Sequence, residues 1–284
     1  MGILGSLIFF LTFACAKENK PHAPTPNEGL KNEYTLRVAS AKFDFDQETG
    51  WPAREDCDGT LWAGLANAAG VSSVKIELAE HFPGEIHRRP FKPCWTPEDG
   101  DIGSQTTVSR DMLQGYMYAL WRQRNLAAFE RLAKYGESHG WKMGEPLADG
   151  RVLLSGNGVG TLGRAVHRLG GPAKVYRHTP YFYASSGPDY AKHLTALGIA
   201  LNGEIDGAIT DQAKDVLKSL YEENQKDALF CSLHKLYTDG CTDVCADLLL
   251  GDYQYPSYVR GDPNYLTTHW LFVAKILLGG ETCQ

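Results

Sequence analysis

The feature that most limits the fold of this 284-residue chain is a helical periodicity that recurs between long polar loops. The clearest example begins at Ser109, where a polar, glycine-containing loop changes into an amphipathic helix. The Ser109 hydroxyl is expected to accept a backbone N–H of the first turn. Asp111 falls in that turn, where the helix dipole favours a carboxylate. The buried face of this helix is expected to contain Leu113, Tyr116, Met117, Leu120 and Trp121.

The same periodicity predicts most of the remaining chain to be helical. Val74–Leu78 and Arg151–Leu154 are exceptions, whose patterns predict short strands. The sequence therefore predicts a single, mainly α domain over residues 34–284, built of helices, long loops and short strands. The expected helices are 60–69, a helix restarting at Asn125, 161–169, 190–206, a helix capped by Thr210 or Asp211, 227–237, 243–250 and 265–278.

Gly158–Gly163 contains the spacing Gly-x-Gly-x-x-Gly, which is typical of dinucleotide-binding loops. Such a fold needs an acidic residue about twenty positions further on. The region after Gly171 has basic and aromatic residues instead. We therefore expect a glycine-rich loop that enters a helix, and no nucleotide cofactor.

The N-terminus carries a signal for export. Residues 3–16 are almost wholly apolar but too short to span a bilayer comfortably, which predicts a signal peptide over residues 1–16. The proline-rich, polar residues 17–33 predict a flexible tether. Residues 11–15 (Leu-Thr-Phe-Ala-Cys) resemble a bacterial lipobox, in which Cys15 becomes lipidated and anchors the protein in the cell envelope, at the outer membrane. Cleavage within Ala14-Cys15-Ala16, followed by secretion, is the alternative.

Six cysteines remain when Cys15 is set aside, and an even number in an exported chain predicts disulfides. We expect Cys57 to pair with Cys94, and the cysteines at 231, 241, 245 and 283 to pair among themselves. A metal site around Cys231 and His234 is the alternative, but its spacing matches no standard zinc pattern. No metal is therefore expected. The net charge of −6 disfavours a nucleic-acid partner, which requires a basic face.

Three loop-to-helix junctions resemble the helix starts of six-hairpin (α/α) toroid proteins, many of which cleave or bind glycans. They are residues 56–59 (Asp-Cys-Asp-Gly), 109–112 (Ser-Arg-Asp-Met) and 265–272 (Tyr-Leu-Thr-Thr-His-Trp-Leu-Phe). The resemblance covers about residues 34–279 and implies a toroid-like array of helical hairpins. Because the chain is shorter than such proteins usually are, we expect the ring to be incomplete.

The resemblance implies that the concave end of the array holds a polysaccharide. A glycosidase needs one carboxylic acid to protonate the leaving oxygen, and a second carboxylate that activates water or attacks directly. Our candidates are Asp58 and Asp111, with Asp56 or Asp101 as substitutes. Arg110 would bind a substrate hydroxyl or carboxylate. Further substrate contacts are expected from Asp101, Trp95, His178 and Tyr181.

Other interpretations remain open. A polysaccharide lyase would use a Tyr or His base with an Arg that neutralises a uronate, for which His87, Arg88, His178 and Tyr181 are available. A non-catalytic envelope lipoprotein would use the same cleft for binding or scaffolding. The simplest interpretation of residues 109–111 is a well-capped helix with a surface Arg and Asp. No Gly-x-Ser-x-Gly motif indicates a nucleophilic serine.

Overall fold

The computed structural model describes residues 26–40, 51, 58–90, 108–143, 156–172, 186–238, 240–251, 253–257, 259 and 261–280. These residues are mainly α-helical, as the sequence predicts. A 3₁₀ turn, η1 (Ile76–Ala79), leads into a small antiparallel pair of strands, β1 (Glu80–Phe82) and β2 (Glu85–Ile86). The helices are α1 (Pro26–Ser40), α2 (Gly59–Ala68), α3 (Arg110–Gln123), α4 (Leu126–Ser138), α5 (Gly156–Arg168), α6 (Asp189–Asp206), α7 (Asp211–Glu223), α8 (Ala228–Thr238), α9 (Asp243–Leu250) and α10 (Pro263–Leu277).

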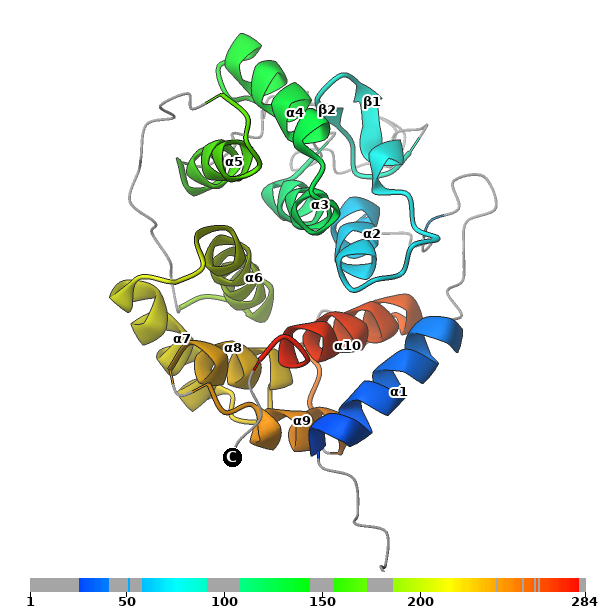
Figure 1. Cartoon of the computed structure of the whole chain (residues 1–284), viewed down its shortest axis with the longest axis vertical. Coiled ribbons are helices and arrows are strands. Elements are labelled where there is room, and N and C mark those ends of the chain that lie inside the picture. Colours follow the sequence, from blue (N-terminus) through cyan, green and yellow to red (C-terminus); the bar gives the residue numbers. More distant parts are fainter. Residues whose placement is uncertain are drawn as a thin grey trace, which may run out of the picture.

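Six of these helices contact one another in a cyclic order. Helix α2 packs on α3, α3 on α5, α5 on α6, α6 on α8, α8 on α10, and α10 again on α2. Helices α1, α4, α7 and α9 pack against members of this set and lie toward the periphery in Figure 1. The largest wholly buried side chains come from both groups, and they include Trp62, Tyr116, Tyr118, Tyr265, Phe129 and Phe272.

Contacts between side chains show that helices of the cyclic set point in the same direction. Near the starts of α3 and α6, the Gln114 amide donates to the Leu194 carbonyl at 3.1 Å. Near their ends, the Arg122 guanidinium contacts the Glu204 carboxylate at 2.6 Å. The two helices are therefore parallel, and their N-terminal ends lie together.

Helix α8 shares this direction. Asp189 at the start of α6 and Asp227 just before α8 line one pocket, whereas Tyr237 near the end of α8 lies against Gly203 near the end of α6. Helix α10 is oriented in the same way. Its Tyr265, close to its start, stacks on Trp62 close to the start of α2, and its Ile276, close to its end, lines a pocket together with Glu204 near the end of α6. Several helix N-termini are thus gathered at one end of the molecule.

Two of the tight connections form as the sequence predicts. Gly207 adopts a left-handed conformation (φ 77°) after α6, and the Thr210 hydroxyl then accepts the Ala213 N–H at the start of α7. Between α3 and α4, Arg124 is left-handed (φ 56°), and the Asn125 side chain caps α4. Each pair of helices is therefore joined by a short turn.

The expected tether differs from the structure from residue 26 onward. Helix α1 starts at Pro26, so residues 26–33 are helical and not part of an extended linker. Leu30 is fully buried, and Tyr34 and Val38 pack against the core, which gives α1 an apolar face with a spacing of four residues. This face contacts α9 and α10. Proline content suggested a linker here, but tertiary packing decides the structure.

Two further local predictions were wrong. Residues 76–78, expected in a strand over Val74–Leu78, belong to η1, and the strands come later. Gly158–Gly163 lies inside α5 and not in a loop, so these glycines do not form the turn of a phosphate-binding loop. Residues 151–154, the other expected strand, are outside the described residues.

The cysteine expectation is met for one pair. Cys231 in α8 and Cys245 in α9 form a disulfide, so neither thiolate is available for the alternative metal site. Among the described residues, no group of three or more side chains is arranged to hold a metal ion. Cys57, Cys94, Cys283, the signal peptide and Cys15 lie outside the described residues. None of the helices in the described ranges has the length and hydrophobicity needed to cross a membrane.

Candidate functional site

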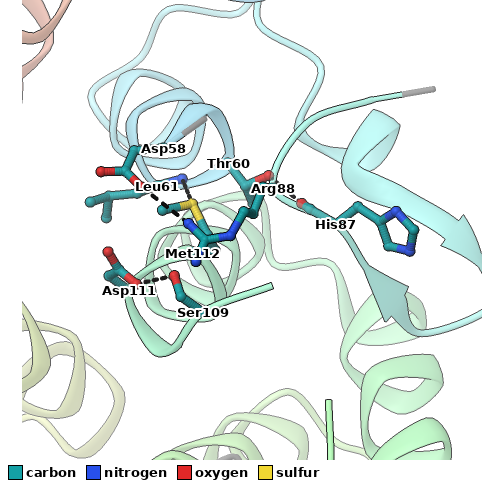
Figure 2. Close-up of polar contacts among 8 residues, drawn as sticks. All are labelled: Asp58, Thr60, Leu61, His87, Arg88, Ser109, Asp111 and Met112. Carbon is teal, nitrogen blue, oxygen red and sulfur yellow. Dashed lines mark hydrogen bonds and ion pairs between the residues drawn. The ribbon is translucent and has the colours of Figure 1, made fainter. Parts of the chain in front are cut away.

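The candidate site is positioned by a very close contact between α2 and α3. A Cβ atom added to Gly64 would overlap the backbone of Gly115, and one added to Gly115 would overlap the backbone of Leu61. Near the helix starts, the Leu61 N–H points at the Met112 sulfur at 3.3 Å. Near their ends, Gln123 donates to Asn67 at 3.1 Å. The helices are therefore parallel, and their N-terminal ends are held together (Figure 2).

Asp58 immediately precedes α2, where its side chain would be expected to cap the helix. It makes no side-chain cap hydrogen bond. Its carboxylate instead contacts the Arg88 guanidinium at 3.3 Å, and the two side chains are 31% and 12% exposed. Arg88 is fixed there because its carbonyl accepts the Thr60 N–H at 2.9 Å, while the Thr60 hydroxyl donates to the His87 carbonyl at 2.5 Å. The segment that follows β2 thus places Arg88 beside the start of α2.

Ser109 occupies the N-cap position of α3, but the predicted cap was wrong. The Ser109 hydroxyl makes no cap hydrogen bond and donates to the Asp111 carboxylate. Asp111 is half-buried, and the neighbouring Arg110 is exposed. Figure 2 shows Asp58 and Asp111 at the starts of the two adjacent helices, on the side from which both helices begin. The polar side chains at both helix starts are thus directed toward other side chains.

Three other helices have a side chain that caps their start, whereas Thr242, the N-cap residue of α9, makes no cap hydrogen bond. Asn125 caps α4, Thr210 caps α7, and Asp262 accepts the N–H groups of Asn264 and Tyr265 at the start of α10. Such a cap satisfies backbone donors that have no partner within the helix. At the starts of α2 and α3 no side chain provides this stabilisation, and the Asp58 and Asp111 carboxylates contact Arg88 and Ser109 instead.

The remaining predicted site residues cannot be placed beside this pair. Asp56, Trp95, Asp101, His178 and Tyr181 all lie outside the described residues. The described part of the site therefore comprises two carboxylates and two arginines, Arg88 and Arg110. Paired carboxylates can act as acid and base, and arginines can bind hydroxyl or carboxylate groups of a ligand.

A buried histidine pair lies one turn deeper than Asp58. Trp62 of α2 stacks on Tyr265 with ring centroids 4.1 Å apart, and His193 of α6 lies 6.3 Å from the Trp62 ring. The His193 and His269 Nε2 atoms are 2.8 Å apart, and the Tyr253 hydroxyl lies 2.8 Å from His269 Nδ1. His269 is therefore a buried histidine with hydrogen-bond partners.

Both histidines are neutral at neutral pH because they are sealed from water. Burial lowers the pKa of His269 to about 3. Burial, together with the adjacent His269, also lowers the pKa of His193 well below its ordinary value. Sequence reasoning did not single out His193 or Tyr253, since no local pattern links positions 193, 253 and 269. Only the packing of α2, α6 and α10 brings them together.

Comparison with known proteins gives no assignment, because no protein-family model, curated protein or solved structure matches the chain. Any statement about function must therefore come from the chemistry of the site.

Proposed function

We propose that the protein is an exported, glycan-active enzyme, a glycoside hydrolase that uses Asp58 and Asp111 as its paired carboxylates. The observation that carries this proposal is the departure from ordinary capping at two adjacent helix starts. Asp58 contacts Arg88, and Asp111 accepts from Ser109, although both carboxylates lie beside backbone N–H groups that need acceptors. A purely structural role would favour capping there.

We further propose that the six helices in cyclic contact are the inner ring of an (α/α) toroid. The shared direction of α2, α3, α6, α8 and α10 supports this arrangement, as do the four peripheral helices. A toroid of six hairpins has six outer helices. In this interpretation η1, β1 and β2 occupy the place of one outer helix between α2 and α3, and the ring of hairpins is incomplete.

In the proposed reaction, one of the two carboxyl groups protonates the glycosidic oxygen as the bond breaks. The other carboxylate either activates a water molecule or attacks the anomeric carbon. Arg88 orients Asp58, and the exposed Arg110 contacts the substrate. Asp56, Asp101, Trp95, His178 and Tyr181 are the further contacts proposed from the sequence. No cofactor takes part in the steps assigned to these residues.

Export and anchoring through Cys15 are part of the proposal. The Cys231–Cys245 disulfide supports an oxidising compartment outside the cytosol, since such bonds are rare where thiols are kept reduced. The lipid anchor rests on the lipobox resemblance alone. It is tested by locating the protein in fractionated membranes with and without Cys15→Ser.

The enzymatic proposal is tested by incubating the purified protein with a panel of bacterial and plant polysaccharides that includes peptidoglycan. New reducing ends and unsaturated sugar ends are measured on the same samples. Reducing ends without unsaturated ends, lost in Asp111→Asn, are expected. Unsaturated ends would replace the proposal by a lyase. If no product forms while the protein is folded, the proposal of catalysis is contradicted and a binding lipoprotein takes its place.

A further inference from the structure

A pocket lies at the same end of the helix array as Asp58 and Asp111. It has a volume of about 290 Å³ and is formed by the starts of α6 and α8 and by residues 254–256, which precede α10. Because α3 and α6 are parallel, the start of α6 lies on the same side as the start of α3. Ligand pockets usually begin at about 300 Å³, so this volume suits one small ring and not an extended chain.

The walls of this pocket carry positively charged, negatively charged and neutral polar groups. Asp189 and Asp227 contribute carboxyl groups, Gln254 contributes an amide, and Lys192 pairs with Glu223 at 2.8 Å. Opposite charges lie close together, so neither a strongly cationic nor a strongly anionic ligand is favoured. A hydroxyl group both donates and accepts hydrogen bonds, and therefore suits such a lining.

Tyr255 adds an aromatic surface to the polar lining. Its side chain is half-buried and packs against Tyr253, with ring centroids 4.4 Å apart. An aromatic ring offers flat apolar area together with a polar hydroxyl. This combination matches a sugar ring, which has hydroxyl groups at its edge and C–H groups on its faces.

The pocket is preformed by hydrogen bonds between its walls. The Gln254 N–H donates to the Lys226 carbonyl at 3.1 Å, and the Ser257 hydroxyl donates to the Asp189 carboxylate at 2.8 Å. Asp227 accepts the N–H groups of Leu229 and Phe230 and thereby fixes the start of α8. Walls that are ordered before binding lose less entropy when a ligand arrives.

Asp227 also has an unusual protonation behaviour. Burial raises the pKa of its carboxyl group to about 7, and the charge on Asp189 adds to the effect. Near neutral pH the group therefore carries a proton for part of the time. A protonated carboxyl can donate as well as accept, which extends the match to hydroxyl groups.

We propose that this pocket binds one uncharged sugar unit of the glycan on which the enzyme acts. The inference rests on the proposed function, because it extends the substrate contacts from the α2–α3 end to the starts of α6 and α8. The pocket thereby adds binding energy from a part of the substrate that does not react. Such remote contacts contribute to affinity and to the positioning of the bond that is cleaved.

The test measures the binding of chitotetraose, cellotetraose and xylotetraose to the purified protein by calorimetry, with tetragalacturonate as the charged comparison. Gln254→Ala and Tyr255→Ala are each expected to weaken the binding of a neutral oligosaccharide about tenfold or more. Lys214→Ala, on the exposed surface of α7, is the matched control and is expected to leave binding unchanged. Gln254 is exposed, so its substitution provides a readout even if Tyr255→Ala is poorly folded.

The outcomes separate this inference from the proposed function. If Asp111→Asn abolishes cleavage but both pocket variants bind like wild type, the pocket assignment is overturned and the hydrolase remains. If the pocket variants lose binding while no glycan is cleaved, the pocket assignment stands and the hydrolase falls. Tighter binding of tetragalacturonate than of every neutral probe would overturn the assignment to an uncharged sugar, and no binding of any probe would overturn the pocket site itself.

Discussion

Two aspartates placed just before helices of the same array serve different purposes. Asp227 precedes α8, is buried, and accepts two backbone N–H groups of that helix. Asp58 precedes α2, is partly exposed, and contacts Arg88 without capping its helix. Position in the sequence therefore does not reveal which contacts such a residue makes. The Asp227 carboxyl group is committed to the start of its own helix, whereas the Asp58 carboxylate contacts a side chain from another segment.

The largest effect is expected where the contact between α2 and α3 is disrupted. Gly64→Val places side-chain atoms where the backbone of Gly115 lies, and neither helix backbone can yield without separating the two helix starts. We expect a loss on the order of 5 kcal/mol in the free energy of unfolding, measured with urea. Gly261→Ala, at a position with open space, is the control. Equal stability of both variants would contradict the close contact.

A smaller effect, which depends on pH, is expected from Asp227→Asn. The pKa of the Asp227 carboxyl group is about 7 in the folded protein, against 3.8 for an ordinary Asp. Protonation of Asp227 therefore contributes to the free energy of unfolding below pH 3.8, and this contribution is lost as the pH rises toward 7. Asn lacks the titration but still accepts N–H groups.

Between pH 4 and pH 8 the free energy of unfolding should therefore fall further in wild type than in Asp227→Asn. The difference between the two decreases should be on the order of 4 kcal/mol. Urea unfolding of both proteins at the two pH values measures this difference. Parallel pH profiles would show that burial does not perturb Asp227, and the contrast with Asp58 would weaken accordingly.

The next effect concerns a residue that caps its helix. Asp262→Ala removes the acceptor for two N–H groups at the start of α10 and should cost about 1–2 kcal/mol of unfolding free energy. Asp262→Asn keeps an acceptor and should cost much less. A thermal melt of both variants distinguishes these cases. If the two melt alike, the hydrogen bonds to Asn264 and Tyr265 do not stabilise the helix.

The smallest stability effect is expected at the candidate site. Asp58→Asn removes no cap hydrogen bond, and Asn can still accept from Arg88, so the free energy of unfolding should change by less than about 0.5 kcal/mol. The same urea titration measures it. A loss as large as that of Asp262→Ala would mean that Asp58 is structural, and the distinction drawn from hydrogen bonding would be wrong.

Much of the helical structure could be predicted from the sequence. The break at Asp206-Gly207, the cap at Thr210 and the restart at Asn125 all follow from local residue preferences, and each is present. Helix α1 was missed because its stability comes from packing of Leu30 and Tyr34 on other helices, which local composition does not reveal. Likewise, Gly158–Gly163 is helical despite its glycines.

The candidate site could be predicted only in part. Asp58 and Asp111 were found because each stands at the start of a helical pattern. Their common location depends on Gly64 and Gly115, which are 51 positions apart, and no local pattern relates them. Arg88, which follows β2, is held beside Asp58 by a backbone hydrogen bond to Thr60, and this contact too forms only in the folded chain.

The central claim is tested most directly by the rate at which Asp111→Asn releases reducing ends from a polysaccharide that wild type cleaves. Asp211→Asn is the matched control, since Asp211 also lies in the first turn of a helix but is 96% exposed and contacts Lys214. We predict a loss of about a hundredfold or more for Asp111→Asn and an unchanged rate for Asp211→Asn. Equal rates for the two variants would contradict a catalytic role for Asp111.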